Sequence, residues 1–222
     1  MKSLLHSVIT IILCATAFWG CSDNNEPNLS DNKQYSMVTF QEENNNGSIF
    51  TYQTSENSPL ITLRTSTATN LNVKKGTRVM LYYWVTNKNS DTDLNISIDF
   101  TLSVLFDSLR MATKANIDIA PSNPIKLKSI WRTGDFINYS GALQYTGSPR
   151  QFYLVMDQAT MENDTIKAYL IDNIMGHDGY FYRKAFGSFF VGYISQKSKC
   201  KVFRVYVNDE NYPSVKYYDF NN

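Results

Sequence analysis

Residues 95–102 read NISIDFTL and alternate between polar and apolar side chains without interruption. The apolar members are Ile96, Ile98, Phe100 and Leu102, and the polar members are Asn95, Ser97, Asp99 and Thr101. Successive side chains of a β-strand point to opposite faces, so a period of two is typical of a strand with one wet face. The stretch therefore predicts a half-buried β-strand.

Strand patterns of three kinds recur along the chain. They are alternating segments at 137–145 and 166–170, runs that are apolar on both faces at 79–85 (VMLYYWV) and 152–156 (FYLVM), and segments rich in Val, Tyr and Phe at 201–207 and 214–220. The two-sided runs predict central strands that are covered on both faces. No segment keeps a 3.6-residue period over three turns, and residues 106–115 favour either one short helix or an irregular crossover. The sequence therefore predicts an almost wholly β fold.

The first twenty residues have the layout of a secretory signal, with Lys2 ahead of an apolar run that ends near Gly20. The run is shorter than the roughly 20 residues that a transmembrane helix needs. Because Cys21 stands where cleavage would fall, the segment resembles a bacterial lipoprotein signal. We therefore expect residues 1–20 to be a signal peptide and Cys21 to carry the lipid; an ordinary signal with a chance cysteine is the alternative.

Residues 21–34 are expected to form a flexible tether. The part at 22–33 reads SDNNEPNLSDNK and has too little apolar content to bury a core. With this lipid the protein would be an outer membrane lipoprotein, and the membrane would be one of its partners. Asp23 and Glu26, close behind the cysteine, favour the cell surface over the periplasmic face, and both orientations stay open.

Charge and cysteine content narrow the classes of function. The chain has 21 Lys and Arg against 20 Asp and Glu, so removal of Lys2 with the leader leaves a formal charge near zero. A neutral chain argues against a nucleic-acid partner, which requires clustered cations. Cys14 leaves with the leader and Cys21 takes lipid, so Cys200 has no partner for a disulfide framework. A break near residues 121–124 divides the folded part into 35–122 and 123–222.

Several motifs carry a resemblance to a known family. They are KGTRV at 75–79, ATK at 112–114, IWRTGDFIN at 130–138, FYLV at 152–155, DN at 172–173 ahead of GHD at 176–178, YR at 182–183 and FGSF at 186–189. In this order they resemble the NigD-like lipoproteins, over nearly the whole mature chain. The resemblance implies an OB-like β-barrel at 35–122 and a β-sandwich at 123–222, on a lipidated tether.

The family name comes from a gene neighbourhood linked to a bacteriocin, which suggests an immunity or accessory role. One departure concerns the strand before the aspartate-rich loop. The family often has a His-Asn pair there, whereas this chain has Asp172 and Asn173 and places His177 further on. A role that depends on the pair is therefore in doubt for this chain.

The residues give little support for catalysis. His177 is the only histidine of the mature chain, and no Gly-x-Ser-x-Gly elbow is present. Cys200 lies among strand residues and is expected to fill the core. One histidine and one cysteine cannot build a zinc site, and the oxygen-rich segments 89–93 and 172–178 do not follow the spacing of a calcium loop. We therefore predict no catalytic residue, no metal ligand and no cofactor.

The residues give more support for a binding surface than for catalysis. Aromatic residues make up 14% of the chain, and residues 180–184 read YFYRK. Aromatic side chains beside cations resemble recognition surfaces, so Tyr180, Tyr182 and Arg183 are the candidates; a packed crossover is the alternative.

Two functions from different classes remain. The first is a non-catalytic, lipid-anchored module that binds an unknown envelope protein or glycan. The second is an envelope hydrolase that acts on glycan or peptide with two carboxylates in a groove between the domains.

Overall fold

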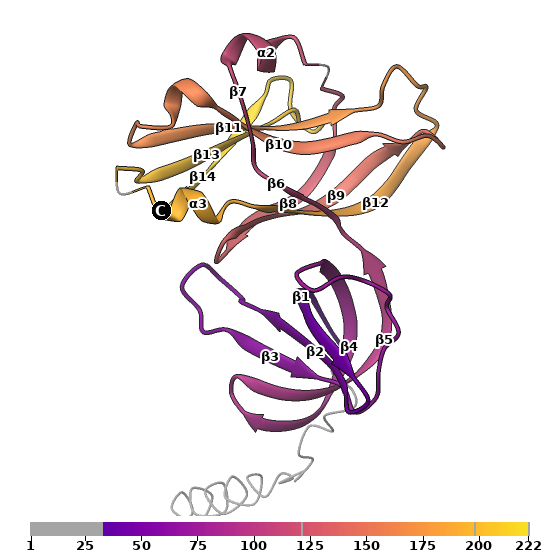
Figure 1. Ribbon diagram of the computed structural model, residues 1–222. Coiled ribbons are helices and arrows are strands. Elements are labelled where there is room, and N and C mark those ends of the chain that lie inside the picture. Colours follow the sequence, from indigo (N-terminus) through magenta and orange to yellow (C-terminus); the bar gives the residue numbers. More distant parts are fainter. Residues whose placement is uncertain (1–32, 121, 198, 222) are drawn as a thin grey trace, which may run out of the picture.

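The computed structural model describes residues 33–120, 122–197 and 199–221, which form a closed β-barrel followed by a two-sheet sandwich (Figure 1). This arrangement confirms the all-β class, with an OB-like barrel ahead of a β-sandwich. The expected signal peptide, Cys21 and nearly all of the expected tether lie outside the described residues. None of the described helices is both long and apolar enough to span a membrane.

The barrel is built from β1 (Gln34–Asn44), β2 (Gly47–Tyr52), β3 (Ile61–Arg64), β4 (Arg78–Ser90) and β5 (Asp93–Ser103). The strands follow the order β1-β2-β3-β5-β4 around the closed wall, with β3 and β5 parallel and the other neighbours antiparallel. A five-stranded barrel of this kind is OB-like. Its interior is filled by completely buried apolar side chains, among them Val38, Phe50, Leu63, Leu81 and Tyr83.

Strand β5 contains the alternating stretch 95–102, but only the first half of the stretch follows the prediction. Ile96 is buried, whereas Phe100 is 42% exposed and Leu102 is 37% exposed. Tyr82 pairs with Phe100 and Tyr83 pairs with Ile98, so the register shifts by one residue on β5. One extra residue in a strand turns every later side chain to the opposite face. The single apolar face predicted for β5 is therefore wrong beyond Ile98.

The two runs predicted as central strands are confirmed. In β4, Leu81 faces the barrel core while Met80 packs against Phe186 of the sandwich. In β10 (Gln151–Asp157), Leu154 belongs to the sandwich core while Val155 packs with Ile117 on the outer side. Both runs are apolar on two faces because both faces are covered.

The sandwich consists of two packed sheets. The five-stranded sheet has the order β14-β13-β11-β10-β7, and the four-stranded sheet has the order β6-β12-β9-β8. The remaining elements are β6 (Leu105–Ser108), β7 (Arg110–Ala112), α2 (Lys114–Asp118), β8 (Lys126–Thr133), β9 (Phe136–Tyr145), η2 (Gln158–Thr160), β11 (Thr165–Asn173), β12 (Phe181–Phe190), α3 (Gly192–Ser195), β13 (Val202–Val207) and β14 (Lys216–Asn221). Ile137, Tyr139, Phe189 and Phe203 are among the buried residues between the sheets.

The chain passes from the barrel to the sandwich at Val104, between β5 and β6. Strand β6 pairs with β12 and β7 pairs with β10, so residues 105–112 belong to the sandwich sheets although they precede the expected boundary at 122/123. The segment 106–115, expected as a short helix or a crossover, is a crossover with two short strands, and α2 begins only at Lys114. Residues 122–124, which include Pro124, then lead into β8 within the sandwich.

Candidate binding surfaces of the barrel and the waist

The barrel closes through only the first part of β5, and its wall is unpaired beside the rest of this strand. Strand β3 pairs with β5 only from Thr62 to Arg64, whereas β5 continues to Ser103. A hollow of about 1150 Å³ occupies the opening and is lined by seven consecutive β5 residues, 95–101. One face of a strand presents every second residue, so a consecutive run shows that the hollow follows the edge of the strand. We call this hollow the barrel slot.

The edge of β5 that faces the slot carries main-chain groups available for pairing. Within the described parts of the chain, β4 is the only segment that makes backbone hydrogen bonds with residues 96–103. A strand has hydrogen-bonding groups on both sides, so the side away from β4 is an exposed edge. Such an edge can accept a further strand.

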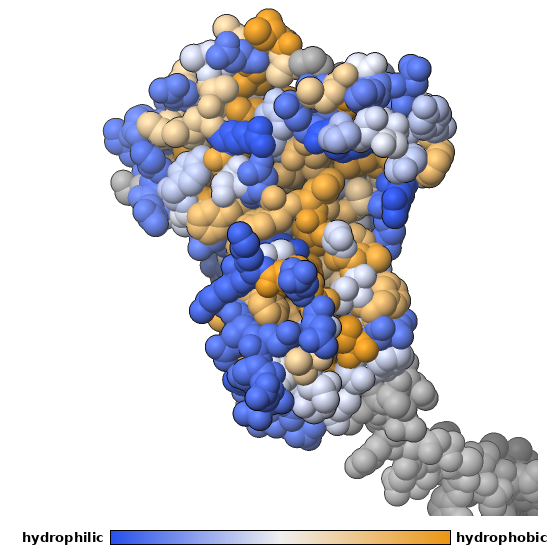
Figure 2. All heavy atoms as spheres, turned by 45° about the vertical axis from the view of Figure 1, so that its right-hand side comes forward, coloured by the Kyte–Doolittle hydropathy of each residue, from blue (hydrophilic) through white to orange (hydrophobic). Residues whose placement is uncertain are grey.

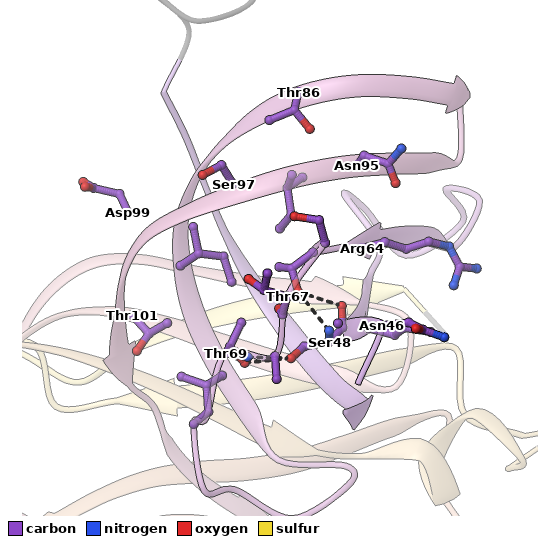
Figure 3. Close-up of a pocket in the computed structure, with 18 of the residues that line it drawn as sticks. Asn46, Ser48, Arg64, Thr67, Thr69, Thr86, Asn95, Ser97, Asp99 and Thr101 are labelled. Carbon is purple, nitrogen blue, oxygen red and sulfur yellow. Dashed lines mark hydrogen bonds between the residues drawn. The ribbon is translucent and has the colours of Figure 1, made fainter. Parts of the chain in front are cut away.

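The opposite wall of the slot is the loop at 65–69, which Glu43 holds in place. Glu43 Oε2 accepts hydrogen bonds from the backbone N–H groups of Thr69 (2.8 Å) and Asn70 (3.0 Å) and from the hydroxyl of Ser48 (2.6 Å). The bond from Ser48 is the main cause that lowers the pKa of Glu43. Figure 3 shows Thr67 and Thr69 on this wall, across from Ser97 and Thr101 on β5.

The slot is lined mainly by neutral polar groups, including Ser48, Ser66, Thr67, Thr69, Thr86, Asn87, Asn95, Ser97 and Thr101. Arg64 and Asp99 are the charged residues of the described lining. Arg64 Nε lies 3.1 Å from a carboxylate oxygen of Asp93, and Asp99 is paired with Lys33. The slot therefore offers uncharged donors and acceptors, which suit a peptide main chain or sugar hydroxyls.

The barrel and the sandwich are joined at a waist around Arg78, which is 3% exposed. Its guanidinium donates hydrogen bonds to Thr39 Oγ1 (2.9 Å), Ser188 Oγ (3.1 Å) and Asn138 Oδ1 (3.1 Å). The same group lies 4.4 Å from the ring centre of Phe136. Burial lowers the pKa of Arg78 to about 10. A buried cation with neutral partners is held firmly, but its charge is not compensated.

The waist brings together motifs that are far apart in the sequence. Arg78 comes from the KGTRV motif, Phe136 and Asn138 come from IWRTGDFIN, and Ser188 comes from FGSF. Asn138 also accepts a bond from the Ser188 hydroxyl at 2.9 Å. Three of the motifs behind the family resemblance thus meet at the junction between the two units.

Two further hollows flank the waist and share Lys184 and Phe186 in their linings. The first hollow, of about 680 Å³, includes Lys128, Tyr35 and Tyr82. The second hollow, of about 830 Å³, is lined by residues of β5, β9 and β12, by Leu105 and by the loop at 146–150. Figure 2 shows apolar side chains gathered where the barrel meets the sandwich. We call the two hollows together the waist groove.

The three residues predicted as a binding surface are not brought together. Tyr180 is 72% exposed and lies outside the linings of the slot and the waist groove. Tyr182 lies under Lys126, whose Nζ is 4.0 Å from the ring centre, and burial raises the pKa of Tyr182 to about 12. Arg183 lines the second hollow, whose described lining contains neither Tyr180 nor Tyr182. Their role in binding stays a prediction.

Sequence reasoning did not single out Tyr35, Lys128 and Lys184 as site residues. Lys184 belongs to the YFYRK stretch that contains the predicted binding residues, so the sequence indicated its segment but not the residue itself. Tyr35 and Lys128 sit in ordinary strand sequence, and only the junction of the two units places them in one hollow.

The structure also shows where the residues considered for catalysis lie. Cys200 is buried, and burial raises its pKa, while His177 lies exposed in a loop. Asp172 is 1% exposed and lies 3.0 Å from Arg150 Nη1, and burial raises its pKa to about 6. Across the described chain, no three His, Cys, Asp or Glu side chains form a group that could hold a metal ion.

No protein-family model matches the chain, and a search of curated proteins found no relative. Solved structures do match. A protein of unknown function from Bacteroides vulgatus has a TM-score of 0.70 at 17% identity, covering 86% of this chain and 91% of its own. A proposed lipoprotein from Bacteroides fragilis has a TM-score of 0.62 at 10% identity, covering 86% and 98%.

A NigD-like immunity protein from Bacteroides caccae has a TM-score of 0.58 at 17% identity, covering 85% of this chain and 96% of its own. At these identities the likeness concerns the fold. The resemblance to the NigD-like proteins, drawn from the order of motifs, is confirmed at that level. The chain therefore has the barrel-and-sandwich fold that the NigD-like immunity protein also has.

Proposed function

We propose that this protein is a non-catalytic, lipid-anchored module of the cell envelope that binds a partner polypeptide in the barrel slot. The observation that carries the proposal is the open edge of β5 along residues 96–101, which faces the hydroxyl-rich loop at 65–69. An extended segment can add to such an edge through main-chain hydrogen bonds. The neutral polar wall opposite can bond the outer side of the same segment.

The slot has room for a strand. Residues 96–101 span about 20 Å at roughly 3.3 Å per residue, and a neighbouring strand needs about 4.8 Å of lateral space. The bulge in β5 protects the edge from indiscriminate pairing. Because the bulge interrupts this edge and the loop at 65–69 faces it, the edge favours one partner strand over general aggregation.

An immunity-related role and an envelope location form part of the proposal. One structural neighbour is described as a NigD-like immunity protein and another as a proposed lipoprotein. The lipid on Cys21 would anchor the chain to the outer membrane, with Asp23 and Glu26 favouring the cell surface. The tether would then hold the barrel within reach of a toxin that arrives at the envelope.

The hydrolase alternative has less support. It requires two carboxylates in a groove between the domains. The described lining of the first waist hollow, which lies between the units, contains Arg78, Lys128 and Lys184 but neither Asp nor Glu. The buried carboxylate of Asp172 is bonded to Arg150 by both of its oxygens.

The test uses variants that place a lysine in the slot. Ser97 and Thr67 are exposed, so Ser97→Lys and Thr67→Lys are expected to fold and to block an incoming strand. Ser214→Lys, on an exposed loop of the sandwich, is the matched control. Where a bacteriocin gene lies beside the gene of this protein, cells that lack the protein are expected to become sensitive to that bacteriocin. Wild type and the control should restore protection, and the slot variants should not.

Equal protection by the slot variants at equal membrane levels would exclude the slot as the binding site. A photo-crosslinking residue at position 97 gives a second measurement in living cells. If it yields no polypeptide adduct and loss of the protein leaves sensitivity unchanged, the proposed function fails.

A further inference from the structure

The waist groove concentrates positive charge. Its described lining contains Arg78, Lys128, Arg150, Arg183 and Lys184, and no residue of that lining is Asp or Glu. The whole chain, by contrast, has nearly equal numbers of basic and acidic residues. A cleft lined by one sign of charge raises the local concentration of ligands of the opposite sign.

Most of this charge is not neutralised by the protein itself. Lys128 has neither a hydrogen bond nor an ion pair with the described residues, and Lys184 Nζ contacts the hydroxyl of Tyr82 at 3.2 Å. Arg78, at the floor of the first hollow, is bonded to neutral oxygens only. Arg150 is the exception, because it is paired with Asp172. The groove therefore keeps an excess of positive charge.

An aromatic platform borders the same groove. Tyr82 lies between Phe100 at 4.2 Å and Tyr35 at 5.8 Å, with ring planes 17° and 27° from parallel. Both faces of Tyr82 are thus covered, whereas Tyr35 at the end of the stack is 69% exposed. Its outer face can pack against an apolar ring surface. Ser36, Gln53, Thr54 and Ser129 add neutral donors and acceptors.

From this combination we infer that the waist groove binds an acidic oligosaccharide, a sugar chain that bears carboxylate or sulfate groups. The C–H face of a sugar ring suits the face of Tyr35, its hydroxyls suit the serine, threonine and glutamine side chains, and its acidic group suits Lys128 and Lys184. The site lies next to the barrel slot, with which its described lining shares only Thr101, and it goes beyond the polypeptide partner proposed above.

Other anionic ligands match fewer of these features. An acidic polypeptide would use the cations but would leave the exposed ring of Tyr35 without a matching face. A nucleic acid would require many more phosphate contacts than this neutral chain can make. An acidic sugar would contact the lysines, the ring of Tyr35 and the hydroxyl groups of the first hollow at the same time.

Calorimetric titration of the full-length protein in detergent tests the inference with four probes. They are a galacturonate hexamer, a heparin hexasaccharide, neutral maltohexaose and poly-L-glutamate. One or both acidic oligosaccharides should bind at least tenfold more tightly than maltohexaose and poly-L-glutamate, and added salt should weaken the binding. Heparin carries carboxylates as well as sulfates, so binding of the galacturonate hexamer identifies the acidic group as carboxylate, and binding of heparin alone identifies it as sulfate.

Variants locate the site. Lys128 and Lys184 are exposed, so the double variant Lys128→Gln/Lys184→Gln should fold and should weaken binding about tenfold, since each exposed ion pair contributes modestly. Tyr35→Ala should weaken it several-fold. Lys197→Gln is the matched control, because Lys197 is paired with Glu162 at 2.9 Å outside the groove. The slot variant Ser97→Lys should bind the sugar like wild type, which separates this site from the proposed function.

Several results would overturn the inference. These are equal affinity for maltohexaose, equal affinity for poly-L-glutamate, no binding of either acidic hexamer, or unchanged binding in the double lysine variant.

Discussion

Replacing Arg78 by alanine should destabilise the whole molecule, because this side chain joins the barrel to the sandwich. It is 3% exposed and donates three hydrogen bonds to Thr39, Ser188 and Asn138. Hydrogen bonds that involve a charged group contribute about 1.5–3 kcal/mol each, so the three together contribute about 6 kcal/mol. The variant also leaves polar groups of the waist without their donor.

The charge of Arg78 offsets part of that contribution. Burial lowers its pKa from 12.5 to about 10, which corresponds to an unfavourable term of about 3 kcal/mol for the charged form. The net loss from removing both the bonds and the charge is therefore about 3 kcal/mol. Loss of the buried aliphatic stem adds about 1 kcal/mol. Arg78→Ala should thus lower the free energy of unfolding by about 4 kcal/mol, and Arg78→Met by about 3 kcal/mol.

Guanidinium denaturation followed by tryptophan fluorescence measures the effect, since Trp131 lies in the apolar cluster at the waist. Arg64→Ala is the control, because Arg64 makes a partly exposed ion pair whose loss should change stability by less than about 1 kcal/mol. A loss below about 1 kcal/mol for Arg78→Ala, or an equal loss for Arg64→Ala, would refute the role of Arg78 in joining the units.

Three further predictions concern other parts of the chain. Burial raises the folded-state pKa of Asp172 from 3.8 to about 6, so the ionisation of Asp172 opposes folding at neutral pH. The free energy of unfolding should therefore rise as the pH falls from 7 to 5. Asp172→Asn should flatten that rise in thermal melts. Gly47 has a φ of +124°, and a Cβ there would lie 1.9 Å from the carbonyl oxygen of Thr65; Gly47→Ala should therefore lower the melting temperature more than Gly147→Ala, where φ is +70° and the space is open. Cys21→Ser should move the protein from the membrane to the soluble fraction with unchanged circular dichroism, and retention in the membrane would contradict lipid attachment at this residue.

The polarity pattern predicted the strands well because burial acts on each strand face separately. Residues 79–85 and 152–156 are apolar on two faces, and the structure covers both faces of β4 and β10. The same pattern misplaced Phe100 and Leu102. Their exposure depends on a register shift against β4, which a period of two cannot reveal. Local periodicity thus predicts a strand, and its pairing decides which face is buried.

The candidate sites were less predictable than the fold. The barrel slot exists because β3 ends at Arg64 while β5 continues, and no motif marks that difference in length. The waist depends on contacts across long separations, since Arg78 meets Asn138 60 positions away and Ser188 110 positions away. The order of motifs indicated the family resemblance, but only tertiary packing shows that these motifs meet.

Arg78 belongs both to the junction and to the floor of the waist groove, so stability and ligand binding should be coupled. An acidic group held by Lys128 and Lys184 would lie in the field of the Arg78 charge and reduce its unfavourable burial. By mass action, a ligand at 100 times its Kd stabilises the folded state by about 2.7 kcal/mol. Because coupling is reciprocal, a variant that removes the Arg78 charge should bind the acidic sugar more weakly even where its fold is retained. The two units are therefore expected to bind the ligand together, because Arg78 both helps to join them and favours the ligand.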